Sequence, residues 1–102
     1  MSTKPPALSA DEAKRQILFI LDEGYVEPSL HCIHESMQLR GVTMLDIERA
    51  LRTGEIRRQP EWDAEHENWK YRVEGADPDG DDLTVITVII EPNLTLRIVT
   101  VF

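Results

Sequence analysis

Two histidines spaced three residues apart are the first residues in this sequence whose types and spacing could carry out chemistry. His31 and His34 fall within a helix predicted over residues 29–40, and side chains three apart are neighbours on a helix. Imidazole titrates near neutral pH, so either histidine could act as a general acid or base. Arg72 and Arg97 lie in strand-like segments, and their guanidinium groups could hold a phosphate.

These four residues together point to one reaction, the metal-free cleavage of RNA. That reaction needs a base for the 2′-hydroxyl proton, cations for the phosphate and an acid for the leaving oxygen. His31 or His34 would transfer the protons, and Arg72 and Arg97, with Lys70 beside them, would hold the phosphate. The alternative is that both histidines are solvent-exposed residues of an amphipathic helix and that the strand cations are ordinary surface residues.

Metal chemistry finds less support in the spacing. His31, His34 and Glu35 could share a helix face as zinc ligands, but Cys32 points about 100° away from His31. The acidic run over residues 77–82 lacks the glycine and glutamate that a calcium-binding loop requires at its sixth and twelfth positions. A hairpin turn explains that run better. The sequence therefore predicts neither a metal nor a cofactor.

Local signals define the helices that would position the histidines. Ser9 and Glu12 form a capping box, which predicts a helix over residues 10–23, and Thr43 with Asp46 predicts another over 44–53. Gly24, Gly41 and Gly54 would end the three helices. In the second helix, the apolar stripe made by Leu30, Ile33 and Met37 is expected to be buried, and His31, His34 and Gln38 are expected to be exposed.

After Gly54 the hydrophobic pattern changes to the two-residue period of strands. We expect strands over residues 55–59, 69–74, 83–90 and 94–102, joined by short turns, with Tyr71 in the core. The predicted fold is therefore α+β, with three N-terminal helices packed on one face of a four-stranded, mainly antiparallel sheet. Residues 1–8 are expected to form a flexible tail, and residues 9–102 a single domain.

Composition restricts the partners that the chain can bind. The 102 residues include 19 acidic and 11 basic side chains, which gives a net charge of −8 and disfavours binding to RNA phosphates. No apolar run is long enough for a membrane helix or a signal peptide, and Cys32 is the only cysteine. These features predict a cytoplasmic protein with no membrane partner.

The motifs and their order resemble a bacterial family described as a domain of unknown function. The resemblance covers about residues 10–102, and the short motifs that carry it are His31-Cys-Ile-His-Glu-Ser-Met-Gln-Leu-Arg-Gly-Val-Thr43, Asp46-Ile47, Leu51-Arg-Thr-Gly-Glu55, Pro60-Glu-Trp62, Trp69-Lys-Tyr-Arg-Val73, Asp79-Gly80, Leu83-Thr-Val85 and Val99-Thr-Val-Phe102. The chain departs from the family pattern around Met37. Ser36 stands where the family has arginine, and Cys32 stands where it has histidine.

The resemblance implies kinship with the RelE-like ribonuclease toxins. It implies a RelE-like fold, a metal-free endoribonuclease of a toxin–antitoxin module or an inactive descendant of one, and an antitoxin-like partner protein. The alternative function is a non-catalytic domain that binds protein, for example through an edge strand. A terminal strand over residues 94–102, if it lies at the sheet edge, could also support a homodimer.

Overall fold

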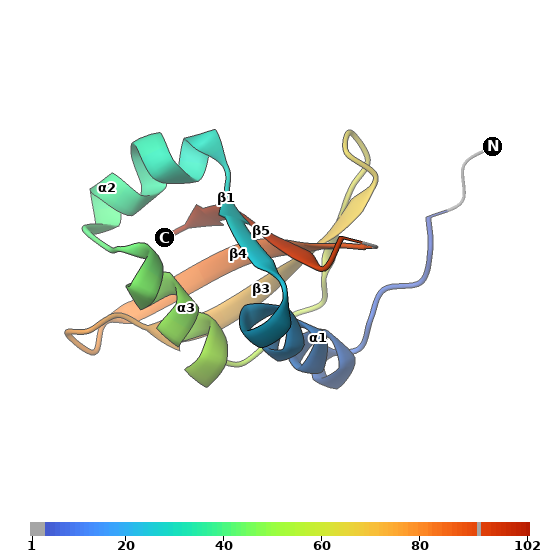
Figure 1. Ribbon diagram of the computed structural model, residues 1–102, viewed down its shortest axis with the longest axis horizontal. Coiled ribbons are helices and arrows are strands. Elements are labelled where there is room, and N and C mark those ends of the chain that lie inside the picture. The colour runs from blue at the N-terminus through green and yellow to red at the C-terminus, as the bar shows by residue number, and fades with distance from the viewer. Residues whose placement is uncertain (1–3, 92) are drawn as a thin grey trace.

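The fold is described from a computed structural model, which places residues 4–91 and 93–102. Helix α1 is followed by a short strand, a second helix made of the π-helical turn η1 and α2, then helix α3 and four strands. In chain order the elements are α1 (Ala10–Glu23), β1 (Tyr25–Pro28), η1 (Cys32–Ser36), α2 (Met37–Arg40), α3 (Met44–Thr53), β2 (Glu61–Asp63), β3 (Asn68–Ala76), β4 (Asp82–Ile90) and β5 (Thr95–Val101). Figure 1 shows α1 and α3 on the same side of the sheet.

The capping signals place α1 and α3 where the sequence predicts them. Ser9 and Glu12 form a complete capping box at the start of α1, and Thr43 and Asp46 form another at the start of α3. Each box satisfies two backbone N–H groups that a helix start otherwise leaves unpaired. Because these signals lie within four residues of the helix start, they can be found without knowledge of the tertiary fold.

The sheet differs from the predicted one in strand number and in direction. It has five strands in the order β1-β5-β4-β3-β2, and β1 pairs with β5 in parallel while the other pairs are antiparallel. The expectation of four strands missed β1, a four-residue strand that ends in Pro28 and pairs with a partner about 70 residues later. The α+β class and the mainly antiparallel pairing are confirmed.

The strand expected over residues 55–59 is wrong. Only Glu55 pairs there, exchanging two backbone hydrogen bonds with Glu74, and the chain then leaves the sheet. Pairing resumes after Pro60, where β2 lies beside the start of β3. Along its outer edge, β3 therefore pairs with two separate segments: β2 opposite residues 68–70, and Glu55 opposite Glu74.

The second helix is rotated relative to the expected orientation. Cys32 and Ser36 are buried and Met37 packs partly buried against the core, whereas Leu30 is 74% exposed and Ile33 is 41% exposed. The predicted buried stripe is therefore wrong for Leu30 and Ile33. The Ser29 hydroxyl donates to the Val99 carbonyl, and the Ser36 hydroxyl accepts from the Val101 N–H. These two bonds fix the helix against the β5 edge beyond the end of β1.

The core lies between the helices and one face of the sheet. Its fully buried side chains come from α1, α3 and the inward positions of the central strands, among them Ile17, Ile20, Ile47, Leu51, Val73, Leu83, Val85, Leu96 and Ile98. Tyr71 is also buried, as predicted. Strand β5 lies between β1 and β4, so it is not an exposed edge, and the basis for a homodimer through residues 94–102 is wrong.

The segment before α1 runs close to β3. Residues 1–3 of the predicted tail lie outside the described residues. The Leu8 N–H donates to the Tyr71 hydroxyl at 3.0 Å, and the Trp69 indole N–H donates to the Pro5 carbonyl at 2.8 Å. These contacts place residues 5–8 against the start of β3, while the flexibility of the tail stays a prediction.

Candidate functional site: the open face of the sheet

The two candidate histidines point into solvent from the second helix. His31 and His34 are exposed, whereas Cys32 and Ser36 of the same helix are buried. His31 Nδ1 lies 2.8 Å from the carboxylate of Glu35 one turn later, and both side chains are more than half exposed. The histidines therefore face away from the sheet.

The two candidate arginines lie on the sheet face that is not covered by α1 and α3, which we call the open face. Side chains alternate along a strand, and Val73 and Ile98 point into the core. Arg72, next to Val73, and Arg97, next to Ile98, therefore point the other way. The structure places the two arginines on one face and does not bring either histidine to them.

A row of paired residues crosses the open face through all five strands. Its members are directly opposite one another in the ladder, in the order Glu27, Arg97, Val88, Lys70 and Glu61. Strands are spaced about 4.8 Å apart, so the backbones at Arg97 and Lys70 are roughly 10 Å apart, with Val88 between them. The row places two cations near its centre and two carboxylates at its ends.

A third cation extends this centre along β3. Arg72 is two residues from Lys70, about 7 Å along the strand, and it pairs across the ladder with Ile86. Its guanidinium carbon lies 5.2 Å from the ring centre of Phe102, a cation–π distance. Lys70, Arg72 and Arg97 thus form a cluster of positive side chains on an acidic protein, which we call the cation cluster.

The carboxylates next to Arg97 and Arg72 lie at different distances from the guanidinium groups. Arg97 forms an ion pair with Glu27 at 2.9 Å, while Arg72 lies 3.9 Å from Glu74, longer than a hydrogen bond. The Arg97–Glu27 pair is exposed, and exposed ion pairs are worth only about 0–1 kcal/mol, so a partner carboxylate can compete for Arg97.

Two aromatic side chains mark the ends of the open face. Tyr25 lies diagonally across the ladder from Arg97 and is 74% exposed, and Phe102 stacks with Arg72 and is 51% exposed. Sequence reasoning missed Tyr25 because it missed β1. The only available signal was the alternation of Tyr25, Val26 and Glu27, which is too short to indicate a strand.

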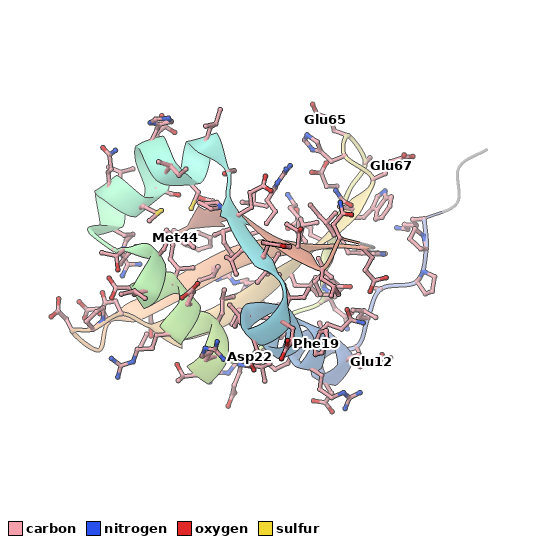
Figure 2. The ribbon with its side chains drawn as sticks, viewed as in Figure 1. Glu12, Phe19, Asp22, Met44, Glu65 and Glu67 are labelled. Atoms are coloured by element: carbon pink, nitrogen blue, oxygen red, sulfur yellow. The ribbon has the colours of Figure 1, made fainter. Side chains whose placement is uncertain are left out.

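Of the residues considered for zinc, His31 and Glu35 contact each other, but within the described residues no third candidate ligand joins them. Cys32 is buried, and burial raises the pKa of its thiol, with a smaller opposing effect from the Ser36 hydroxyl. A different group, Asp63, Glu65 and His66, brings its potential ligand atoms within 4.8 Å of one another at the β2–β3 turn. Figure 2 shows Glu65 and Glu67 at the tip of this turn.

The Asp63 carboxylate already has partners within that turn. Its Oδ2 lies 2.8 Å from His66 Nδ1, and its Oδ1 accepts from the backbone N–H groups of Glu65 and His66. The hydrogen bond from His66 is the main reason that the pKa of Asp63 is lowered, and burial opposes it. These hydrogen bonds explain why the three side chains lie close together: the Asp63 carboxylate caps the backbone of the turn.

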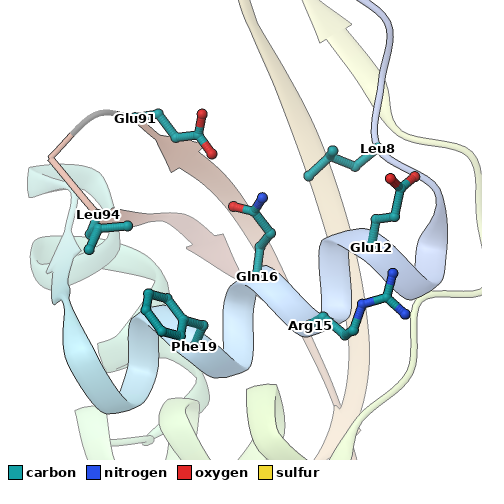
Figure 3. Close-up of a pocket in the computed structure, with 7 residues that line it drawn as sticks. All are labelled: Leu8, Glu12, Arg15, Gln16, Phe19, Glu91 and Leu94. Carbon is teal, nitrogen blue, oxygen red and sulfur yellow. The ribbon is translucent and has the colours of Figure 1, made fainter.

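A hollow of about 510 Å³ lies on the other side of the molecule, between α1 and the connection from β4 to β5. Figure 3 shows Phe19 and Gln16 from α1 facing Leu94 and Glu91, with Leu8, Glu12 and Arg15 toward the other end of the hollow. Phe19 is 53% exposed in this hollow. The hollow contains none of the candidate residues from the sequence.

The fold and this site together define the class of protein: a small α+β domain with a mixed five-stranded sheet, covered by α1 and α3 on one face and charged on the other. Residues 29–102 match the DUF4258 family, described as a domain of unknown function, and the chain belongs to this family. No curated protein matches the chain. No solved structure matches it either. The matched region contains all of β2 to β5 and therefore the cation cluster.

Within the described residues, no helix has the length and apolar character needed to cross a membrane.

Proposed function

We propose that this chain is a non-catalytic protein-binding domain that docks an acidic segment of a partner protein on its open face. The observation that carries the proposal is the arrangement of Lys70, Arg72 and Arg97 around Val88, between the exposed rings of Tyr25 and Phe102. Tyrosine, phenylalanine and arginine are the residues in which protein interfaces are enriched. The expected kinship with RelE-like toxins is kept in the proposal, with the chain as an inactive descendant that retains an antitoxin-like partner.

A protein partner fits this face better than RNA does. Arg72 and Arg97 each have a carboxylate within 4 Å, and Glu61 lies directly opposite Lys70 on the neighbouring strand. Glu27 and Glu61 also close the two ends of the row across the sheet. A phosphate backbone would meet these carboxylates along its path, and the net charge of −8 adds repulsion at long range. A short peptide segment can place its carboxylates on the cations and avoid the acidic ends.

The open face also fits better than either edge strand. Strand β1 ends in Pro28, which lacks a backbone N–H, and β2 is only three residues long with Glu61 and Asp63 in it. Short, charged or proline-containing edges resist pairing with an added strand. We therefore place the partner on the face and not at the edge.

The test begins with a displayed library of random twelve-residue peptides selected on the purified protein. Enriched peptides should combine Asp or Glu with apolar residues. For the tightest synthetic peptide, Lys70→Glu and Arg97→Glu should each raise the Kd at least about tenfold, or ~1.4 kcal/mol. Fluorescence anisotropy with the labelled peptide measures the effect.

The matched control is Arg49→Glu, which reverses the same charge at an exposed position on α3, in the helix layer. The Kd of this variant for the peptide should stay within about twofold of the wild-type value, because a charge far from the binding site acts on the peptide only through screened electrostatics. Failure to enrich any peptide, equal weakening by the control, or cleavage of labelled single-stranded RNA by the purified protein would reject the proposal.

A further inference from the structure

A polar cleft of about 410 Å³ opens at one corner of the open face. The chain leaves α3 at this corner and pairs once with β3, through Glu55. The cleft lies between this segment, the end of β3 and the start of β4. Its polar lining consists of two arginines, three carboxylates and two threonines: Arg57, Arg72, Glu55, Glu74, Asp82, Thr53 and Thr84. The sequence did not predict this cleft, because its lining residues come from three separate segments of the chain.

Arg72 is the arginine of this cleft that has a buried N–H group. Its Nε is buried and has no hydrogen-bond partner within the described part of the chain. Its Nη2 lies 3.9 Å from the Glu74 carboxylate, and its guanidinium group lies over the ring of Phe102. Buried N–H groups nearly always have an acceptor, and a guanidinium edge matches the two oxygens of a carboxylate.

The second arginine can take part without losing its present partner. Arg57 binds one carboxylate oxygen of Glu55 through Nε and Nη2, both at 3.2 Å, and the side chain is 63% exposed. Its remaining N–H groups are oriented by this pairing. An oxyanion in the cleft would therefore meet two cations, one fixed by stacking and one by an ion pair.

The charge of the lining restricts the ligand further. The two arginines are outnumbered by Glu55, Glu74 and Asp82, so the lining has a formal charge of −1. A phosphate dianion would be repelled by three carboxylates at short range. A ligand with one carboxylate and two cationic groups complements both the arginines and the remaining acids.

We propose that this cleft binds a free basic amino acid such as arginine or lysine. The ligand carboxylate accepts hydrogen bonds from Arg72 and Arg57, and the cationic groups of the ligand lie against Glu74 and Asp82. This site goes beyond the proposed partner-binding function and depends on Arg72, whereas the test of that function depends on Lys70 and Arg97. Either proposal can fail while the other stands.

The experiment titrates the purified full chain with L-arginine and L-lysine and follows the ¹⁵N–¹H signal of Arg72 Nε by NMR. Saturable shifts with a Kd of about 1 mM or tighter are expected. Agmatine, which lacks the carboxylate, and acetate, which lacks the cations, should each bind at least about tenfold more weakly.

Variants separate the cleft from the rest of the open face. Arg72→Gln should weaken L-arginine binding at least about tenfold, and Arg97→Gln, the matched control, should leave it unchanged. Asp82→Asn, at an exposed position at the start of β4, should weaken binding and covers the case in which the Arg72 variant does not fold. No saturable binding at 10 mM ligand (about ten times the expected Kd), equal binding of acetate, or wild-type affinity in Asp82→Asn would overturn the proposal.

Discussion

At the scale of single residues, Asp77 shows how one carboxylate organises a turn. Its Oδ1 accepts from the backbone N–H groups of Asp79 and Asp81, and its Oδ2 accepts from Arg40 at 3.0 Å. Burial raises the pKa of Asp77, but these hydrogen bonds together hold it below its ordinary value. The acidic run that invited a calcium interpretation is thus a turn tied to the end of α2.

This arrangement predicts the pH dependence of an Asp77→Asn variant. A carboxylate whose folded pKa is lowered stabilises the fold above its unfolded pKa of about 4, and this contribution is lost as the pH falls through the folded value. The variant should be less stable than wild type at pH 7, and the difference should shrink toward pH 3. Urea unfolding at both pH values measures it.

Asp79→Asn is the control for that experiment. The Asp79 side chain is exposed, and only its backbone N–H takes part in the turn. Its unfolding midpoint should follow that of wild type at both pH values. A difference between wild type and Asp77→Asn that is constant with pH would contradict the account of this turn.

The histidines give a second prediction at the residue scale. Because His31 and His34 face solvent and lie away from Arg72 and Arg97, replacing both by alanine should leave peptide binding and RNA integrity unchanged. The measurements are the peptide Kd and the electrophoretic profile of total RNA after incubation with wild type and variant. RNA cleavage by wild type that the double variant lacks would restore the ribonuclease hypothesis.

At the scale of elements, the close contact between α3 and β3 depends on Gly75. A Cβ at this position would lie 2.8 Å from the carbonyl oxygen of Ala50 and 3.0 Å from its Cα. Backbone atoms of a helix cannot move aside cheaply, so Gly75→Ala should destabilise the fold by about 1–3 kcal/mol. The measurement is the free energy of unfolding in urea.

Gly80→Ala provides a comparison in which space is not limiting. Nothing lies within 4 Å of a Cβ built there, but Gly80 has a φ of 87°, which an alanine adopts with strain. Its cost should come from the turn alone, about 1 kcal/mol. The helix–strand contact would be refuted as a constraint if Gly75→Ala were as stable as wild type.

How far the sequence predicts each element depends on where the determining contacts lie. The helices α1 and α3 follow from caps and stops a few residues apart, and β3 and β4 follow from their own alternation. Strand β1 and the rotation of the second helix depend on β5, about 65–70 residues away in sequence. No local pattern contains that information.

The candidate site follows the same rule. The alternation around Arg72 predicts that its side chain points away from the core, and the sequence pattern places Arg97 in the last strand. Only the register across β5, β4 and β3 shows that Arg97, Val88 and Lys70 lie in one row. The missing convergence of the histidines depends on the helix orientation, which the Ser29 and Ser36 bonds to β5 determine.

At the scale of the whole molecule, an acidic protein presents a small positive centre on one face. The cation cluster is surrounded by a net charge of −8, so attraction of an acidic segment is short in range and repulsion dominates beyond it. Raising the salt concentration from about 0.05 to 0.5 M therefore screens both effects and should change the peptide Kd by less than about tenfold. A steep loss of affinity with salt, as phosphate binding shows, would contradict a protein partner.

The most direct test of the central claim is to map the bound peptide on the molecule by amide chemical-shift changes in the full chain. The account predicts that the largest changes fall on the open-face positions of β5, β4 and β3, around Arg97, Val88 and Lys70. Changes that instead centre on the second helix, around His31 and His34, would contradict it.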